Sequence, residues 1–535
     1  MSRGVALAAA LLLIPAYAAA QVAAERFDIE RFQIEGNTLL GSEELAASVQ
    51  PFTGKGRAYG DIKLALEALR QRYLARGYSV VWVVAPEQDL DRGFVRLQVI
   101  EGRVGKVTIE GNRHFDDENI RASLPSLREG EPPRAGDISA DSQLANESPS
   151  KQVDVVLRPG VQAGQVDAGI EVIDVAPLKA FMTFDNTGNE QTGDYRLGVG
   201  VQHANLFNRD HVGTLHYVTS PQKASQVKLY SASYRLPLYA LGDSMDFIAA
   251  YSDVDAGSTQ TVAGPLGLSG RGTVFGWRYN QLLQRHGVYS HRLVYGLDYR
   301  AYENTCSLGV FGTAGCGPAA VDVTVRPLSV AYSGNWAQPG RISDFYVALS
   351  QNLPGTAKGG ESDFNAARPG SVAGTGAPAD YRILRFGGST VGAFDNNWQM
   401  RAAVNLQYSP DPLVAGEQFG IAGAMSVRGF REREVAGDSG YFANLELYSP
   451  NLAGTMIPGK GNLRGLLFYD VAMAKNHSLP GELQQKTSIA SVGAGLRWNI
   501  ERNFNMRFDL ARVVDAGGSK SDGDVRGHVS VYLGF

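Results

Sequence analysis

The sequence predicts a mainly β protein, in which a sixteen-stranded antiparallel β-barrel spans a membrane and follows two small α/β modules. Three observations predict this class. A short stretch is repeated early in the chain, the hydrophobic pattern changes to a period of two residues from Leu178 onward, and the connections between the expected strands are alternately long and short.

The composition suits many exposed strands. Glycine (63), tyrosine (23) and phenylalanine (22) are plentiful, whereas charged residues make up only 19% of the 535 residues. No run of 18 or more apolar residues occurs, which excludes a helical membrane protein. The net charge of −4 does not support nucleic-acid binding, because a nucleic-acid partner calls for a clustered basic surface.

Residues 1–20 have the pattern of a secretory signal peptide. Arg3 precedes an apolar run from Val5 to Ile14 that is too short to span a bilayer, and Pro15 and alanines with A-x-A spacing follow it. We therefore expect these residues to be removed and the mature chain to leave the cytoplasm.

The repeated stretch marks two modules. RFQIEGN (31–37) recurs as KVTIEGN (106–112). Each copy continues with helical patterns and then two alternating runs, so we expect the order β-α-α-β-β in both modules, over residues 27–101 and 102–175.

Each module offers recognisable helix faces and strands. In the first, Ile62, Leu66, Leu69 and Tyr73 share one face of a helix that Gly77 ends. Strands follow at 78–84 and 94–100. The second module is expected to contain helices near 117–124 and 137–147, and strands at 153–157 and 169–173.

Residues 176–535 are assigned to the barrel, where no convincing helix is expected. The sixteen expected strands lie near 178–187, 194–204, 211–219, 225–236, 243–252, 273–283, 288–302, 321–334, 340–351, 380–390, 396–408, 438–448, 463–473, 488–498, 503–513 and 526–535. Long connections follow several odd-numbered strands and mostly short ones follow even-numbered strands. This alternation is typical of an outer-membrane barrel.

The two faces of the expected strands differ in polarity. Phe504, Met506, Phe508 and Leu510 share one face, opposite charged or polar neighbours. Lipid outside and a wet lumen inside accommodate both faces. We expect the lumen charges mainly to solvate the barrel wall, with a part in substrate passage as the alternative. They are Arg292, Asp298, Arg300, Arg507 and Asp509.

The two cysteines lie in a glycine-rich connection. Because the chain is exported, we expect Cys306 and Cys316 to form a loop disulfide, with two free thiols as the alternative.

No catalytic, metal or cofactor site is predicted. GDSG (437–440) is similar to a serine-protease nucleophile, but Tyr441 follows where a further glycine is expected. The eight histidines show no HExxH or paired spacing, and there is no GxxxxGK[ST] phosphate loop. We therefore predict no enzyme activity, no metal and no cofactor.

The chain resembles the two-partner-secretion transporters, which are the haemolysin/haemagglutinin secretion and activation proteins of Gram-negative outer membranes. The resemblance covers nearly the whole mature chain. It is carried by the two repeated modules, which look like polypeptide-transport-associated (POTRA) domains, by FDNTG (184–188) at the start of the barrel, by VRGF (427–430), and by the terminal Phe535.

This resemblance implies a contact between a loop and the barrel wall. VRGF would tip an extracellular loop that folds back into the lumen, where Arg428 meets an aspartate. The match is Asp470, which forms an F-x-D pattern with Phe468. Gly429 would let the loop turn sharply, while Val427 and Phe430 shield the charged pair from water.

The resemblance also implies a function and partners. The protein would secrete an exported partner protein across the outer membrane, and POTRA modules in the periplasm would bind the N-terminal secretion domain of that partner by adding a strand to a free sheet edge. Outer-membrane lipid is the second expected partner. The third is the barrel assembly machinery, through the C-terminal strand that ends at Phe535.

One alternative and one departure accompany this expectation. Assembly factors that insert other barrels share POTRA modules and the VRGF loop, although they usually carry three or more modules. Members of the secretion family often have an N-terminal helix that plugs the barrel. Only residues 21–26 separate the expected signal from the first module, so we expect no such helix here.

Overall fold

The structure is a computed structural model that describes residues 26–535 except 163, 191, 254–256, 262–263, 269–270, 304–317, 319–320, 371, 373–374, 454–460, 479–485 and 518–520. The expected signal peptide and the expected Cys306–Cys316 disulfide lie outside the described residues. The chain divides into two compact units, one with the residues up to Lys106 together with 129–135 and 159–166, and one with the rest. No described helix is long and apolar enough to cross a membrane.

The first module packs two helices on a small sheet. Its elements are β1 (Phe27–Ile29), β2 (Arg31–Glu35), α1 (Ser42–Val49), β3 (Gly54–Arg57), α2 (Tyr59–Ala75), β4 (Val81–Val84) and β5 (Phe94–Glu101). The sheet has the order β2-β5-β4, and β1 pairs with β3 beside it. Ile62, Leu69 and Tyr73 are buried in the core, as the predicted helix face requires. The β1–β3 pair was not predicted.

The second module repeats this order. Its elements are β6 (Arg103–Glu110), α3 (Asp117–Ala122), α4 (Ala135–Ala145), β7 (Lys151–Pro159) and β8 (Gln165–Asp174), and its sheet has the order β6-β8-β7. The β-α-α-β-β order predicted from the sequence is thus present in both modules.

The repeated glycine has a physical cause. Gly36 and Gly111 have φ values of +81° and +91°, and a Cβ atom on either would lie 2.3 Å from a carbonyl oxygen, that of Val99 or Val172. Only glycine fits such a close approach of two backbones at positive φ. The repeated sequence therefore corresponds to one type of turn that occurs in both modules.

Each module also fixes the turn after this glycine with a carboxylate. Glu101 accepts hydrogen bonds from the backbone N–H groups of Thr38 (2.8 Å) and Leu39 (2.9 Å). In the second module, Asp174 accepts from three consecutive N–H groups, those of Arg113, His114 and Phe115, at 2.8–3.0 Å. These two acids occupy equivalent positions in the two modules. The hydrophobic pattern of the sequence did not indicate them.

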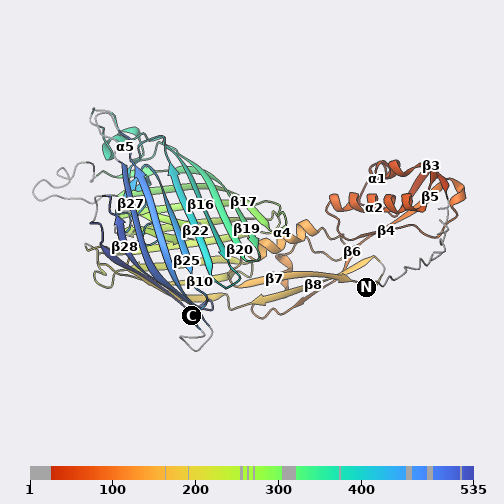
Figure 1. Ribbon diagram of the computed structural model, residues 1–535, viewed down its shortest axis with the longest axis horizontal. Coiled ribbons are helices and arrows are strands. Elements are labelled where there is room, and N and C mark those ends of the chain that lie inside the picture. Colours follow the sequence, from red (N-terminus) through yellow and green to blue (C-terminus); the bar gives the residue numbers. More distant parts are fainter. Residues whose placement is uncertain are drawn as a thin grey trace, which may run out of the picture. The chain divides into compact units, whose positions relative to one another are not determined.

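The barrel closes with sixteen strands among the described residues, when β18 and β19 are counted as one strand interrupted at Arg326 (Figure 1). The strands are β9 (Leu178–Asp185), β10 (Arg196–Leu206), β11 (His211–Thr219), β12 (Leu229–Leu238), β13 (Asp243–Asp253), β16 (Arg271–Leu282), β17 (Tyr289–Glu303), β18 (Val323–Val325), β19 (Pro327–Gln338), β20 (Arg341–Asn352), β21 (Arg382–Ala393), β22 (Gln399–Tyr408), β25 (Ser439–Tyr448), β26 (Asn462–Lys475), β27 (Lys486–Ile500), β28 (Phe504–Asp515) and β29 (Val525–Gly534). All sixteen predicted strands are present, with ends shifted by a few residues.

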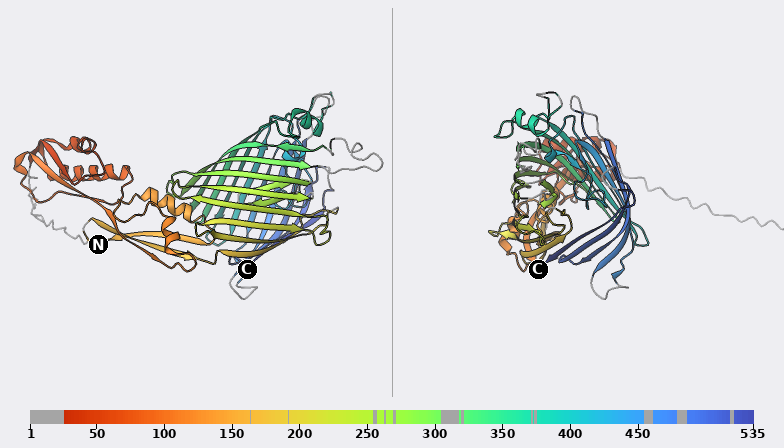
Figure 2. Two further views of the ribbon diagram at one scale, coloured as in Figure 1. Left: turned by 180° about the vertical axis from the view of Figure 1, so that it is seen from behind. Right: turned by 90° about the vertical axis from the view of Figure 1, so that its left-hand side faces the viewer.

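The barrel is antiparallel throughout, and its first and last strands close it. The closing pair β9–β29 runs from Asp185 with Ser530 to Phe181 with Gly534. Figure 2 shows the tilted strands from two further sides. Large apolar side chains on alternate residues are exposed on the outer face, for example Leu467 and Leu510, which is the pattern of a lipid-facing wall.

The long connections contain structure that the sequence did not indicate. The expectation of no helix after Leu178 is wrong, because α5 (Glu361–Ala367) lies between β20 and β21 at the end of the barrel opposite α4 (Figure 1). Its Phe364 is fully buried against Tyr381. Two hairpins also occur, β14 (Gly257–Thr261) with β15 (Gly264–Leu268), and β23 (Phe419–Gly420) with β24 (Ala436–Gly437).

A buried ion pair joins the second module to the barrel within the same compact unit. Nζ of Lys151 lies 2.5 Å from Asp210, which is in the turn between β10 and β11, and it donates to the Asn119 side chain at 2.8 Å. Burial lowers the pKa of Lys151, and the charge of Asp210 opposes this effect. The strand ends on this side of the barrel are therefore the ends that face the second module.

We predict that the turn-fixing acid makes the first module sensitive to low pH. Burial alone would raise the pKa of Glu101, but the hydrogen bonds from Thr38, Leu39 and Tyr73 lower it. A lowered carboxyl pKa stabilises the module above the unfolded value of about 4.3, and this contribution is lost as the pH falls through the folded pKa. Glu101→Gln should cost on the order of 1–2 kcal/mol at pH 7 and much less at pH 3.

Denaturant unfolding of a fragment of residues 26–102 at both pH values would measure this, since the core of the module is contributed entirely from within it. The control is Glu87→Gln, which removes an exposed carboxylate from the same module. Equal destabilisation by Glu101→Gln at pH 7 and pH 3 would contradict the assigned role.

Candidate functional site in the barrel lumen

The connection between β22 and β25 folds into the barrel and places VRGF against its inner wall. The small β23–β24 sheet closes the base of this loop. Beyond it, Val427 and Phe430 are fully buried in a cluster with wall residues of β26, β27 and β28, among them Ala472, Ile489 and Val513. The apolar neighbours of Arg428 thus hold the loop tip on the wall by burial of apolar surface.

Gly429 is required by the turn at the tip. Its φ of +98° is in the left-handed region, and a Cβ atom would lie 3.2 Å from a methyl group of Val513. Its N–H donates to Nε2 of His528 at 2.9 Å. The loop tip therefore contacts the last strand of the barrel as well as the strands next to it.

Arg428 is buried and forms a forked pair with Asp470. Nε and Nη2 donate to the two carboxylate oxygens, each at 2.7 Å, and the backbone N–H of Arg428 donates to Oδ2 at 3.2 Å. The exposed fractions are 3% for Arg428 and 0% for Asp470. The guanidinium carbon lies 3.5 Å from the centre of the Phe468 ring, so a cation–π contact adds to the pair.

Two further carboxylates complete the environment of Arg428. Nη1 lies 2.9 Å from Glu446 and 3.4 Å from Asp509. These acids are shared, since Arg401 pairs with Glu446 at 3.1 Å and Arg497 pairs with Asp509 at 2.9 Å. Three cations and three anions, with Asp470 counted, thus form one network, in which Arg428 and the three acids are buried.

The comparisons with known proteins decide the family. The POTRA domain of ShlB type matches residues 27–102, and the description "Haemolysin secretion/activation protein ShlB/FhaC/HecB" matches residues 164–308 and 341–498. The chain belongs to this family. It is an outer-membrane transporter of two-partner secretion, with its modules in the periplasm.

Relatives of this family are similar over most of the chain. The outer membrane transporter CdiB of Dickeya dadantii is 24% identical over 88% of this chain and 79% of its own length. The heme/hemopexin transporter protein HuxB of Haemophilus influenzae (strain 86-028NP) is 21% identical over 92% of this chain and 84% of its own.

A solved structure agrees with the fold. CdiB from Escherichia coli has a TM-score of 0.76 and 19% identity, and the match covers 98% of this chain and 94% of that one. The matched family is one of secretion proteins, which does not favour the barrel-insertase alternative.

The structure brings together the residues that the sequence singled out, and adds some that it did not. Val427, Arg428, Gly429, Phe430, Phe468 and Asp470 form one contact region. Sequence reasoning did not assign Asn444, Glu446 or His528 to it. Side chains alternate along β25, so Asn444 and Glu446 lie on the same face of this strand. This alternation is the sequence pattern that could have assigned these two residues to the lumen. Nothing local marks His528.

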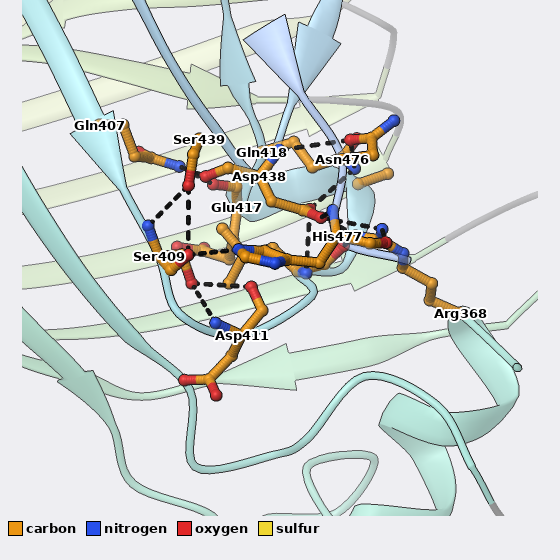
Figure 3. Close-up of polar contacts among 12 residues, drawn as sticks. Arg368, Gln407, Ser409, Asp411, Glu417, Gln418, Asp438, Ser439, Asn476 and His477 are labelled. Atoms are coloured by element: carbon orange, nitrogen blue, oxygen red, sulfur yellow. Dashed lines mark hydrogen bonds and ion pairs between the residues drawn. The ribbon is translucent and has the colours of Figure 1, made fainter. Parts of the chain in front are cut away.

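A second polar cluster fixes the base of the loop at the extracellular end. Asp438, the acid of GDSG, is fully buried and accepts from Arg368, from Gln418 (3.1 Å) and from the backbone N–H of His477 (2.8 Å), as Figure 3 shows. Ser439 donates to the carbonyl oxygen of Ser409. Asp438 and Ser439 therefore have structural roles. Their contacts join the three extracellular connections β20–β21, β22–β25 and β26–β27.

Four of the five predicted lumen charges, Arg292, Asp298, Arg300 and Asp509, lie in ion pairs, whereas Arg507 lies within 4.0 Å of no described acid. Arg300 contacts Asp298 at 2.5 Å and Glu417, in the loop base, at 3.0 Å. Arg292 lies 2.8 Å from Glu147 of the second module. Among the described residues, no group of three or more His, Cys, Asp or Glu side chains is placed to hold a metal ion.

We predict that Gly429→Ala loosens the loop tip without preventing assembly. A non-glycine residue at this φ is strained by about 1–3 kcal/mol, and its Cβ would crowd Val513. The sixteen hydrogen-bonded strands do not depend on this turn. The purified variant should keep the heat-modifiable gel shift of a folded barrel but become sensitive to proteases at residues 421–435.

Gly392→Ala is the control, because a Cβ on Gly392 meets no atom within 4 Å. Unchanged protease resistance of the Gly429→Ala loop would show that the tip tolerates a side chain and that the assigned strain is wrong.

Proposed function

We propose that this transporter captures an unfolded exported protein on its POTRA modules and threads it through the lumen past the VRGF loop. In this proposal the Arg428 network is the lock that holds the loop in the lumen. The observation that carries it is the burial of Arg428 against three carboxylates on strands β25, β26 and β28. No nucleotide is available at the outer membrane, so folding of the emerging chain outside the cell supplies the driving force.

The modules offer edges suited to an extended polypeptide. We assign residues 27–101 and 102–175 to them, and 176–535 to the barrel. In the first sheet, β2 and β4 are edge strands. On β4, Trp82 and Val84 are both exposed by about two fifths (42% and 41%). A strand of the N-terminal secretion domain of the partner can pair with this edge through main-chain hydrogen bonds and cover both side chains.

The remaining partners follow from the outer wall and the last strand. Outer-membrane lipid would cover the apolar outer face. Phe535 follows β29 and is 71% exposed, which leaves the end of the chain accessible to the barrel assembly machinery. We assign no catalytic role, since Asp438 and Ser439 of GDSG are engaged in the loop base.

We predict that the edge of β4 carries recognition. A fragment of residues 21–175 should bind the N-terminal portion of the unfolded partner with a Kd on the order of micromolar, as expected for a transient contact. Trp82→Glu should weaken this binding in calorimetry. Leu64→Glu is the control, because Leu64 is an exposed apolar residue on helix α2 and not on the sheet. Equal effects of the two substitutions would argue against strand addition at β4.

We predict that removing either member of the central pair abolishes most export while the barrel still assembles. Arg428→Ala leaves Asp470 buried without its cation, and Asp470→Ala leaves Arg428 with two shared carboxylates. Breaking a buried pair costs about 3–5 kcal/mol, and this cost falls on the loop rather than on the strand ladder. The measurement is exported partner at the cell surface per assembled transporter.

A charge-swapped pair is not expected to restore export. An aspartate at position 428 would face Glu446 and Asp509, so the swap replaces attraction with repulsion. Arg512→Ala, on the outer face of β28, is the control. Near-normal export from both single variants would rule out the lock.

A further inference from the structure

A row of three arginines crosses the inner wall below the loop tip. Arg464 of β26 is directly opposite Arg497 of β27, which is directly opposite Arg507 of β28. Like charges in directly opposed positions destabilise a sheet. A barrel wall that needed only solvation would be expected to alternate its charges, so this row requires another reason.

The row lacks its own complement of acids. Arg497 donates to both oxygens of Asp509 at 2.9 Å. In the described part of the chain, neither Arg464 nor Arg507 lies within 4.0 Å of a carboxylate. Arg464 donates instead to the backbone carbonyls of Asn397 (2.9 Å) and Ser449 (2.8 Å).

Among the described residues, Arg507 lies next to the loop tip and forms no ion pair with an acid. Its Nη1 is 3.6 Å from the sulfur of Met425, and the residue is exposed within the lumen. The nearby acids Glu446 and Asp509 are already paired with Arg401, Arg428 and Arg497.

The three arginines line one cavity of about 830 Å³ together with Arg428 at the loop tip. Four acids line the same cavity: Glu446 and Asp509, which hold the ion pairs described above, and Asp185 and Glu432, which no ion pair joins to the row. A second row lies one pleat closer to the second module, where Asn462, Asn499 and Asn505 are directly opposite one another. Side-chain amides both donate to and accept from a peptide backbone.

The position of these rows is the entry side of the lumen. Arg464 is the third residue of β26 and Arg507 the fourth of β28, and both strands start at the end of the barrel that contacts the second module. A polypeptide that enters from the periplasm therefore meets the asparagines first, then the arginines, and then the loop tip.

We propose that the arginine row is a binding site for acidic, extended segments of the exported polypeptide. This inference rests on the proposed function. A guanidinium fork matches a carboxylate with two hydrogen bonds, and Arg464 already binds carbonyl oxygens of a backbone. Adjacent strands are about 4.8 Å apart, so the row spans roughly 10 Å, and the long arginine side chains can reach carboxylates at residues i and i+2 of an extended chain, which share one face and lie roughly 6.7 Å apart.

The test uses a fluorescently labelled oligoglutamate peptide and the purified full-length transporter in detergent. Fluorescence anisotropy at low salt should show binding of oligoglutamate that falls with added salt, and no comparable binding of a Gly/Ser peptide of equal length. Arg464→Gln with Arg507→Gln should weaken the binding by about tenfold or more. Arg512→Gln, which shares the outer-face parity of Phe508 and Leu510, should leave it unchanged.

Thermal unfolding of the single variant Arg507→Gln separates a binding role from a structural one, because it keeps the hydrogen bonds of Arg464 to the backbone. Removal of this like charge from the row should leave the midpoint equal or raise it, whereas a structural arginine would lower it when replaced. A lowered midpoint, equal binding by the double variant and the Arg512→Gln variant, or equal binding of the neutral peptide would each overturn the proposal. The peptide assay needs no exported partner, so its failure leaves the proposed function to be judged by export from the unaltered transporter.

Discussion

The arrangement of the lumen depends on keeping one guanidinium away from water. Moving an ion from water into a protein interior costs several kcal/mol even after relaxation. Arg428 meets this cost with a forked pair to Asp470, two shared carboxylates and the face of Phe468. The three acids come from β25, β26 and β28, so the loop tip finds its site only where these strands have closed in the observed register. Loop position and barrel register are therefore specified together.

Two kinds of interaction hold the loop in the lumen, an ion-pair network and the burial of apolar side chains. The ion network is directional and lies on the strands, whereas Val427 and Phe430 are buried in a cluster with the wall. Full burial of one such side chain contributes about 1.5–3 kcal/mol. To leave the lumen, the loop would have to expose apolar side chains and separate Arg428 from three acids. The Asp438 cluster holds the loop base independently, so the tip can move without release of the base.

The sequence predicted the parts whose physics is local. A period of two residues located all sixteen strands, and the repeat located both modules, because Gly36 and Gly111 build the same turn. Helix α5 escaped notice because it has only seven residues, and its stability comes from burial of Phe364 against Tyr381 rather than from a periodic pattern. Asp470 was found through the family pattern, whereas Glu446 and His528 were not. Their contacts with the loop depend on the register between strands, which cannot be predicted from the sequence of one strand alone.

The arginine row and the loop lock share one residue, and this connects entry of a chain to release of the loop. Arg497 is the centre of the row and also the partner of Asp509, which contacts Arg428 at 3.4 Å. A ligand shifts a conformational equilibrium only by its differential affinity for the two states. A carboxylate bound at Arg497 would compete with Asp509 for that guanidinium, and a freed Asp509 would alter the balance around Arg428. In the proposed route, an acidic segment in the row would therefore act on the charges that hold the loop before it reaches the loop itself.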